Sequence, residues 1–438
     1  MTNDSATSTE MTLSDIANLF TPRALTEEQA DLYQETAAVR GADYYEFHEL
    51  LFERIRTSRE KTHILVVGHG GCGKSTELRM LSLKLRKSGV SVIIIEARDD
   101  LDLNNFSYID IFMLIVERLT EYAKDNENKF KIPTKLIKAF NEALTTKITQ
   151  EYWESKSEAG MEAGASISAS LPFLFSFVSK IAASLKLGSA QREEIRRQID
   201  PKMKEIINAL NALLDEINSH SDNKIVIIID GLEKCQTDNA VKLFSRDISS
   251  LSAINTHLIL ACPINIYRSP VANTLQGYFI RPAMMPMIKT HYPDSLDNPF
   301  KYGVDVIKAL IGKRVEDSFF DDGIIDEIIK MGGGSLRDTC SLLSDSAFEA
   351  YMRGSKTVDQ PSFERAMNQF ATDVFYRAES KYYPMIKRIF EGERQPRNNS
   401  DLAQLLYAGV VFEYNGDGWI DLHPLIRHYI EEHMGVLD

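Results

Sequence analysis

Short apolar runs alternate with longer amphipathic segments along the first two thirds of the chain. The apolar runs are rich in β-branched residues and contain few polar positions, which is typical of strands buried on both faces of a parallel sheet. We predict such strands over residues 64–67, 90–95, 224–229 and 257–262. The segments between them repeat apolar residues at helical spacing, which predicts helices over 74–87, 109–124, 134–144 and 191–218. This alternation favours an α/β fold with a parallel sheet.

The chain becomes largely helical after residue 300. We expect a linker over the Pro- and Met-rich residues 282–299, followed by helices over 304–311, 323–330, 335–351 and 361–378. The last part predicts helices over 384–391 and 400–407, a hairpin with strands 410–414 and 419–422, and a final helix over 424–432. The hairpin turn over 415–418 has residues that favour positive φ angles. This order of elements is that of a winged helix.

Two segments do not follow the alternation of strands and helices. The N-terminal 25 residues are polar, and residues 26–56 predict two helices on either side of 40–43. Residues 155–190 combine a stretch of small residues at 158–166 with an intensely apolar stretch at 171–178. We favour a hairpin or helix that packs on the body or in an oligomer, and a membrane-touching or partner-binding element is the alternative. The stretch is too short to span a bilayer.

A length of 438 residues predicts two to four domains. We expect a helical and partly disordered N-terminal segment over 1–45 and an α/β core over 46–290 that carries the insertion 155–190. A helical lid over 300–378 and a winged-helix domain over 380–438 then follow.

The most specific motif connects the first strand to the first long helix. It matches G-x-x-x-x-G-K-S/T, in which glycine backbone N–H groups surround phosphates and the positive end of the helix dipole adds to the binding. We expect Lys74 to reach the β- and γ-phosphates of ATP, Ser75 to ligate Mg²⁺, and Thr76 to add a hydroxyl contact. The predicted nucleotide-binding residues are Gly68, Gly70, Gly71, Gly73, Lys74, Ser75 and Thr76.

The strand over 224–229 leads into Asp230, and Glu233 follows three residues later. In P-loop proteins a carboxylate at this strand end holds the water shell of Mg²⁺, so Asp230 is the second predicted metal residue. Glu233 is predicted to polarise the attacking water, with a solvated acid as the alternative. Ala261-Cys262-Pro263 ends the next strand where a polar γ-phosphate sensor usually lies, so the sensor is absent or displaced to Asn265 or Arg268.

A glycine-rich turn at 332–334 opens the predicted helix that carries Arg337. An arginine there can contact the β- and γ-phosphates and couple the position of the lid to the nucleotide. A surface arginine on a capped helix is the alternative. Arg246 and Arg268 are weak candidates for an arginine finger supplied in trans.

Composition narrows the class of protein without identifying its partner. A hydrophobic content of 44% and a charged content of 26% describe a soluble globular chain, and its formal charge of −13 provides no global attraction to DNA. The winged-helix region is nevertheless locally basic through Lys387, Arg388, Arg394 and Arg397. The four cysteines lack metal-site spacing, and no signal-peptide core is present, so we expect reduced thiols in the cytoplasm and no stable membrane insertion.

The order of P-loop, Asp-ended strand, lid with a Gly-Gly-x-x-Arg turn and winged helix resembles the AAA+/STAND class of ATPases over residues 45–438. Asp230-Gly231-Leu232-Glu233 is similar to the NACHT form of Walker B, although Lys234 replaces its second acid. His423 is similar to the histidine of the Met-His-Asp motif that contacts ADP, although Pro424 replaces the Asp; a core or capping histidine is the alternative. The Arg337 turn resembles sensor 2 of the origin-recognition/Cdc6 branch.

This resemblance implies an oligomeric switch that binds and hydrolyses ATP with Mg²⁺ and regulates a separate effector or sensor protein. Bacterial defence, including antiviral defence, or signalling is the implied setting. Two alternatives stay open at this stage. One is a DNA-binding ATPase of the origin-recognition or transposition-regulator type, which would use the winged helix. The other is a nucleotide-gated scaffold that does not hydrolyse ATP.

Overall fold

The computed structural model describes residues 11–41, 45–126, 132–144, 170–186, 189–220, 225–293, 295–395, 399–414, 419–433 and 435–437. The chain divides into two compact units. The first unit comprises Met1–Leu50, Gly68–Met80 and Met284–Asp438, and the second comprises Leu51–Val67 and Leu81–Ala283. The predicted domain boundaries at 45, 290 and 380 stay predictions.

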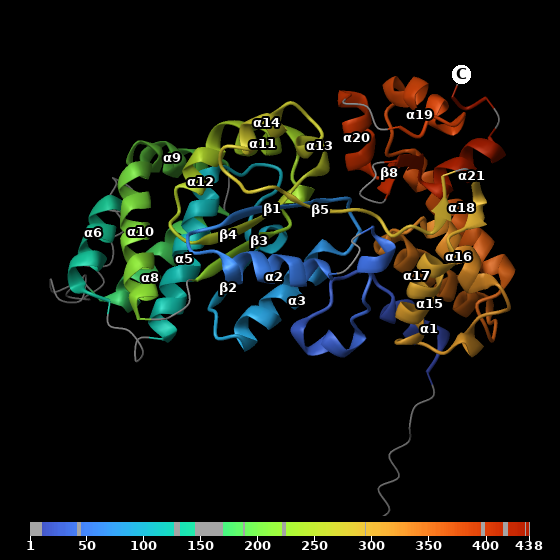
Figure 1. The fold of residues 1–438 in the computed structure, drawn as a ribbon, viewed down its shortest axis with the longest axis horizontal. Helices are drawn as coiled ribbons and strands as arrows, with labels where there is room; N and C mark the ends of the chain where they lie inside the picture. The colour runs from blue at the N-terminus through green and yellow to red at the C-terminus, as the bar shows by residue number, and fades with distance from the viewer. Residues whose placement is uncertain are drawn as a thin grey trace, which may run out of the picture. The chain divides into compact units, whose positions relative to one another are not determined.

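A five-stranded sheet has the strand order β2-β3-β4-β1-β5 (Figure 1). Its strands are β1 (His63–Gly68), β2 (Val92–Glu96), β3 (Val226–Asp230), β4 (His257–Cys262) and β5 (Ala283–Met285). The pairs β1–β4, β3–β4 and β2–β3 are parallel. Every residue of β1, β3 and β4 is buried, which explains their almost unbroken apolar sequences.

The four predicted strands are confirmed, but the predicted linker over 282–299 is wrong in part. Its first residues form β5, and two further short strands, β6 (His291–Tyr292) and β7 (Ser295–Pro299), pair with each other. The sequence Ala-Met-Met of β5 lacks β-branched residues, so the strand has no signal of its own and is held by pairing at the edge of the sheet.

The second unit surrounds most of the sheet residues with helices. Helix α5 (Tyr108–Asp125) begins at a capping box in which the Ser107 and Asp110 side chains each accept from the other residue's backbone N–H. Pro201 divides the long helix predicted over 191–218 because it has no N–H to continue the ladder. The other helical elements between residues 47 and 275 are α2 (Phe47–Thr57), α3 (Lys74–Lys87), α4 (Ala97–Asp100), α6 (Thr134–Leu144), α8 (Leu171–Leu185), α9 (Ser189–Ile199), η3 (Asp200–Lys202), α10 (Met203–Ser219), η4 (Leu232–Lys234), α11 (Thr237–Lys242), η5 (Leu243–Asp247), α12 (Ile248–Ser252), α13 (Ile264–Tyr267) and α14 (Val271–Leu275).

The apolar stretch at 171–178 forms the first half of helix α8, which packs on α5 (Figure 1). Leu174, Phe177 and Val178 are buried, and the Lys124 ammonium lies 4.0 Å from the centre of the Phe175 ring. These side chains are therefore part of the core of the second unit and do not form a membrane-facing surface. The small-residue stretch at 158–166 lies outside the described residues.

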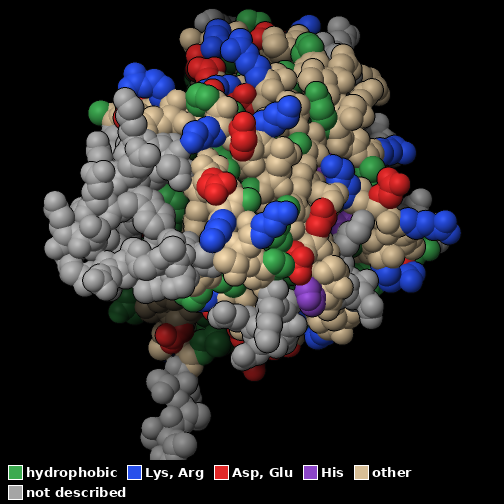
Figure 2. Space-filling view, turned by 90° about the vertical axis from the view of Figure 1, so that its left-hand side faces the viewer, with side chains coloured by type: hydrophobic (Ala, Val, Ile, Leu, Met, Phe, Trp, Pro, Cys, Tyr) green, Lys and Arg blue, Asp and Glu red, His purple; other side chains and the backbone are tan. Residues whose placement is uncertain are grey.

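Figure 2 shows one face of the molecule in space-filling form. Over the part of this face that the structure describes, Lys and Arg side chains are interspersed with Asp and Glu. Alternating charges of this kind produce no large field of one sign. Among the described residues, no helix is both long and apolar enough to cross a membrane.

The first unit is mainly helical outside its P-loop. Helices α17 (Leu336–Arg353) and α18 (Gln360–Phe375) pack together, and α1 (Leu13–Leu19) packs on α17, where the Ser344 hydroxyl donates to the Ala17 carbonyl at 2.6 Å. The predicted helices after residue 300 are confirmed. The unit also contains η1 (Glu27–Leu32), η2 (Ala37–Val39), α15 (Lys301–Gly312), η6 (Asp317–Phe319), α16 (Ile324–Gly332) and η7 (Ser380–Tyr382).

Residues 383–432, which we call the C-terminal hairpin region, contain α19 (Tyr383–Phe390), α20 (Ser400–Ala408), β8 (Val411–Tyr414), β9 (Trp419–Leu422) and α21 (Pro424–Glu432). β8 and β9 are antiparallel, with Tyr414 opposite Trp419. The helix, helix, hairpin, helix order of the sequence analysis is confirmed, and the classification of this region as a winged helix stays a prediction. The predicted turn at 415–418 and Arg397 lie outside the described residues.

Candidate functional site

The P-loop connects β1 to α3 and holds its glycines in conformations that other residues rarely adopt. Gly71 and Gly73 have φ angles of 87° and 103°, and left-handed backbone of this kind costs other L-residues roughly 1–2 kcal/mol. Among the described residues, no backbone carbonyl accepts from the N–H groups of Gly73, Lys74 or Ser75. The loop therefore presents a group of unpaired N–H donors at a helix N-terminus, which is the arrangement that binds anions.

Lys74 is buried, and its ammonium donates to the carbonyls of Gly68 at 3.0 Å and His69 at 2.8 Å. Phosphate oxygens are stronger acceptors for an ammonium than neutral carbonyls because the hydrogen bond is then ionic on both sides. The lysine is thus held inside the loop by bonds that a phosphate could replace. Ser75 is half-buried, and the Thr76 hydroxyl accepts from the Leu25 N–H at 3.3 Å.

The first residues of helix α17, which carry Arg337 and follow the glycine-rich turn at 332–334 (hereafter the lid turn, after the predicted lid), lie directly on the P-loop. The Arg337 N–H donates to the Gly71 carbonyl at 3.3 Å, and a Cβ added to Gly70 would lie 3.0 Å from the Arg337 guanidinium. Ser335 caps helix α17 by accepting from the Asp338 N–H, also at 3.3 Å. The arginine itself is exposed. The structure thus brings Arg337 together with Gly70 and Gly71, and a contact with phosphates stays a prediction.

His69, inside the P-loop, is bonded to the C-terminal hairpin region. Its Nδ1–H donates to the Leu406 carbonyl at 3.2 Å, and its Nε2 accepts from the Glu413 N–H at 2.9 Å. A carbonyl cannot donate and an amide N–H cannot accept, so these two partners fix the neutral Nδ1–H tautomer. Sequence reasoning missed this residue because His69 occupies a variable position of the motif, where no residue type is expected.

His423 is fully buried and bonds to the lid helix. Its Nδ1 accepts from the Leu425 N–H at 3.1 Å and so caps α21, while its Nε2–H donates to Asp338 Oδ2 at 3.3 Å. Burial alone would raise the pKa of Asp338, but the hydrogen bond from His423, a further hydrogen bond with Ser335 and the charge of Arg377 hold this pKa below its usual value. The structure therefore shows the capping role that was the alternative for His423, and the predicted ADP contact stays a prediction.

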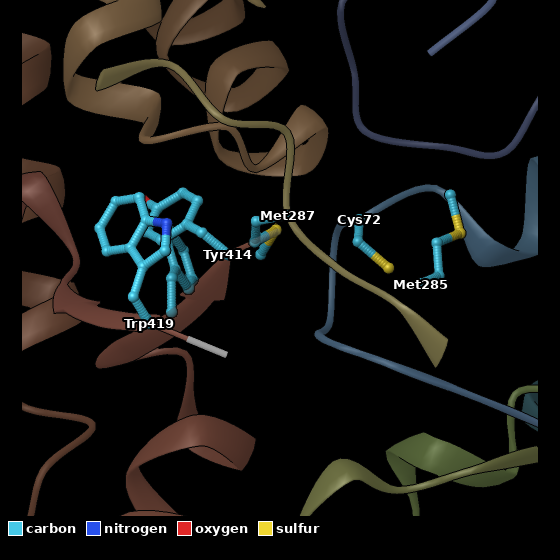
Figure 3. Close-up of a cluster of buried hydrophobic side chains, with 6 residues drawn as sticks. Cys72, Met285, Met287, Tyr414 and Trp419 are labelled. Atoms are coloured by element: carbon cyan, nitrogen blue, oxygen red, sulfur yellow. The ribbon is translucent and has the colours of Figure 1, made fainter. Parts of the chain in front are cut away.

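A cluster of apolar and sulfur-containing side chains joins the P-loop to the C-terminal hairpin region (Figure 3). Tyr414 and Trp419 stack with ring centroids 4.3 Å apart, and the Tyr414 hydroxyl donates to the Gly333 carbonyl at 2.7 Å. The cluster links three sequence segments that no local pattern relates to one another. Its members are Cys72, Met285, Met287, Phe412, Tyr414 and Trp419.

The second unit holds the predicted metal and water residues at the end of β3. Asp230 is buried and accepts from the Gly231 N–H at 2.8 Å. Glu233, on η4, is also buried, and its Oε2 has no hydrogen-bond partner within the described part of the chain. An unsatisfied buried carboxylate oxygen costs about 1–3 kcal/mol, so its presence points to a partner such as water in the working protein.

The end of β4 shows where the candidate sensors lie. Asn265 is buried and its amide donates to the Thr237 hydroxyl at 3.3 Å, whereas Arg246 is exposed on the π-helical turn η5. Arg268 is half-buried at the end of α13. No group of three or more metal-ligating His, Cys, Asp or Glu side chains occurs among the described residues. Ser75 and Asp230 each carry an oxygen donor of the kind that Mg²⁺ takes in proteins, and their role as metal residues stays a prediction.

The parallel sheet and the glycine-rich loop between β1 and α3 define the P-loop NTPase fold. The KAP family P-loop domain matches residues 44–262, which is half of the chain. The chain therefore belongs to the KAP family of P-loop domains.

Three solved structures match the chain over most of its length. The Aeropyrum pernix ORC1 protein in complex with DNA is 13% identical, covers 95% of this chain and 96% of its own, and gives a TM-score of 0.38. Pyrobaculum aerophilum Cdc6p is 11% identical, with 95% and 97% covered and a TM-score of 0.39. The Thermotoga maritima RuvB Holliday junction branch migration motor is 12% identical, with 94% and 98% covered and a TM-score of 0.37. No curated protein matches the chain.

Proposed function

We propose that the chain is an ATP-binding and ATP-hydrolysing molecular switch. The observation that carries this proposal is the set of N–H donors at Gly73, Lys74 and Ser75, which lie without carbonyl acceptors at the start of α3 beside the Lys74 ammonium. Every helix N-terminus leaves such donors without intrahelical acceptors, and here the glycine-rich loop and the Lys74 ammonium lie beside them. A triphosphate would accept from these donors and take the lysine as a counter-charge.

Mg²⁺ would be held by Ser75 and Asp230, and it would neutralise charge on the β- and γ-phosphates. Glu233 would accept a hydrogen bond from the attacking water and orient it, a role supported by its buried, unpartnered Oε2. Arg337 would add positive charge near the phosphates from the lid, a role supported by its bond to Gly71.

The proposed switch couples this chemistry to the C-terminal hairpin region. The bonds of His69 to Leu406 and Glu413 support the coupling, because a change in the P-loop would alter contacts with that region. By the resemblance to AAA+/STAND ATPases, the chain would act as a homo-oligomer with an arginine finger in trans. It would regulate a separate effector or sensor protein, with bacterial defence as the suggested setting.

Steady-state phosphate release with MgATP tests the hydrolytic part. Glu233→Gln is expected to keep ATP binding and to lose about 10²–10⁴-fold in turnover because the water loses its base. The exposed acid Asp238 lies five residues further along the chain, and Asp238→Asn is the matched control that should turn over like the wild type. Equal turnover by wild type and Glu233→Gln would remove Glu233 from the mechanism.

A nucleotide-gated scaffold without hydrolysis is the second candidate. It is favoured by the apolar ending of β4 at Ala261-Cys262-Pro263, which supplies no side-chain donor to a γ-phosphate. The same measurement separates the two candidates. Tight MgATP binding by the wild type with no phosphate release beyond the background of Lys74→Ala would support the scaffold.

A further inference from the structure

Arg40 lies against the P-loop with a fully buried guanidinium that makes only neutral contacts. Its Nη2 donates to the Cys72 carbonyl at 2.6 Å, its Nη1 to the Pro286 carbonyl at 2.5 Å, and its Nε to the Thr36 hydroxyl at 2.9 Å. No carboxylate among the described residues accepts a hydrogen bond from it. Buried arginines are usually paired with an acid because an uncompensated buried charge is costly.

The cost of burying the Arg40 charge lowers the pKa of its guanidinium. The carboxylates of Glu77 and Glu46 counteract this effect of burial on the pKa only through their charges at a distance. The guanidinium is thus kept in a poorly solvated position where its hydrogen bonds are satisfied but its charge is not paired by contact. A ligand that brings negative charge to the P-loop would compensate it.

The Cys72 carbonyl that Arg40 holds belongs to the peptide unit that ends in the Gly73 N–H. The described residues contain no cis peptide bond, so this unit is trans and its N–H points opposite to its carbonyl. Fixing the carbonyl on Arg40 therefore fixes the direction of the Gly73 N–H on the other side. A charge-assisted bond to the carbonyl also polarises the peptide and strengthens that N–H as a donor.

We propose that Arg40 is a positioning residue for nucleotide phosphates: it orients the Cys72–Gly73 peptide toward the phosphate chain and complements the charge of that chain. This inference rests on the proposed function. Arg40 lies 28 residues before Gly68, the first glycine of the motif. The motif itself therefore gives no indication of this role.

The test is the dissociation constant and the number of binding sites for MgATP and MgADP, measured by calorimetry on the full chain. Arg40→Gln removes the charge and is expected to weaken both nucleotides about thirtyfold, as for loss of a hydrogen bond from a charged group. Arg40→Lys keeps the charge but loses the guanidinium, whose three nitrogens donate to three acceptors. It should bind nucleotide more tightly than Arg40→Gln and less tightly than the wild type. Thr36→Val leaves the guanidinium present but loosens it, and should weaken binding by about fivefold.

Arg314 provides a control, since it is half-buried, also has a pKa lowered by burial, and donates to the Leu310 carbonyl. Arg314→Gln should bind MgATP like the wild type. Unchanged dissociation constants in Arg40→Gln and Thr36→Val, with fewer sites per chain, would mean that Arg40 only holds the fold and would overturn the inference. Absence of MgATP binding by the wild type would instead overturn the proposed function itself.

Discussion

Buried charged side chains in the first unit hydrogen-bond to charged or polar partners. Their pKa values predict how the stability of the protein changes as the pH falls. Asp338 is buried between the lid turn and His423, and its pKa lies below the ordinary value of about 3.9. A depressed folded-state pKa means that the ionised form stabilises the folded protein. This contribution is present above the unfolded-state pKa and is lost as the pH falls through the folded-state value.

We therefore predict that Asp338→Asn lowers the free energy of unfolding by about 1.5–3 kcal/mol at pH 7, because a hydrogen bond to a charged group is lost. The difference from the wild type should shrink as the pH falls from 5 to 3. Urea unfolding at a series of pH values measures this. Asp326→Asn, which breaks an exposed ion pair with Lys308, should change stability little at any pH. A pH-independent difference for Asp338→Asn would contradict the ionised assignment.

Asp421, in the C-terminal hairpin region, is also a buried carboxylate with a lowered pKa. Burial alone would raise its pKa, but the His291 ring nitrogen 3.5 Å from the carboxylate, a bond from Arg427 at 2.6 Å and the charge of Arg394 hold the pKa below its usual value. Two arginines that converge on one buried carboxylate anchor β9 to its neighbours. Acid should therefore loosen this region through Asp421 as well as through Asp338.

At the scale of elements, the close approach of the lid turn to the segment after β5 depends on a glycine. Gly334 has a φ angle of 84°, and a Cβ there would lie 1.9 Å from the Ile288 carbonyl oxygen. Gly323 has the same φ of 84° with open space around its Cβ position. An alanine at Gly323 would therefore meet backbone strain alone, whereas an alanine at Gly334 would meet the same strain and a steric clash.

We predict that Gly323→Ala costs about 1–2 kcal/mol through strain alone. Gly334→Ala should cost about 1–3 kcal/mol more, because the methyl group forces the backbone apart. Chemical denaturation of both variants measures the difference. Equal costs would show that the lid turn can move away from Ile288 without loss of stability.

A buried ion pair fixes the position of α9 on α5 in the second unit. Arg196 bonds to both oxygens of Asp110, which is itself part of the cap of α5, and to the Asn105 carbonyl. The neighbouring Arg197 is 76% exposed and pairs only with Glu194 on its own helix.

Arg196→Met should lower the free energy of unfolding by about 3–5 kcal/mol because it leaves Asp110 buried without its partner. Arg197→Met, the matched control, should change it by less than about 0.5 kcal/mol. Thermal or urea unfolding of the two variants side by side gives the comparison. Similar small effects would mean that Asp110 is satisfied by other groups once Arg196 is removed.

Elements with strong local periodicity could be predicted from the sequence, whereas elements held by tertiary contacts could not. The helix over 74–87 and the final helix over 424–432 have the predicted boundaries, because their apolar spacing and terminal residues define them locally. The strand β5 escaped prediction since only sheet pairing holds Ala-Met-Met extended. Pro201 was present in the sequence, yet the periodicity on both sides of it masked the break.

The candidate site shows the same division between local and long-range information. The P-loop motif and Asp230 could be recognised because their chemistry requires fixed residue types at fixed spacing. Arg40 and His69 could not, since the long-range partners that place them, Cys72, Pro286, Leu406 and Glu413, lie 32 or more residues away. Arg337 could be predicted from its position after the glycine-rich turn. Only the structure shows that its N–H donates to the Gly71 carbonyl.

At the scale of the whole molecule, the proposed switch requires that the C-terminal hairpin region respond to the P-loop. We predict that His69→Ala increases amide hydrogen exchange at Val411–Tyr414, because the Glu413 N–H loses its acceptor. His428→Ala changes a half-buried histidine on α21 that bonds to Asn368, and it should leave this exchange unchanged. Unaltered exchange in His69→Ala would show that the hairpin is held independently of the P-loop.

The most direct test of the central claim is MgATP binding by the purified full chain, wild type beside Lys74→Ala, with mass photometry in the presence and absence of ATP. We predict saturable binding by the wild type and at least tenfold weaker binding by Lys74→Ala, since the ammonium loses its phosphate contacts. Lys87→Ala, at the exposed end of the same helix, should bind like the wild type. ATP should also shift the wild type to a larger assembly. Failure of the wild type to bind MgATP, or equal binding by Lys74→Ala, would contradict nucleotide binding at this P-loop.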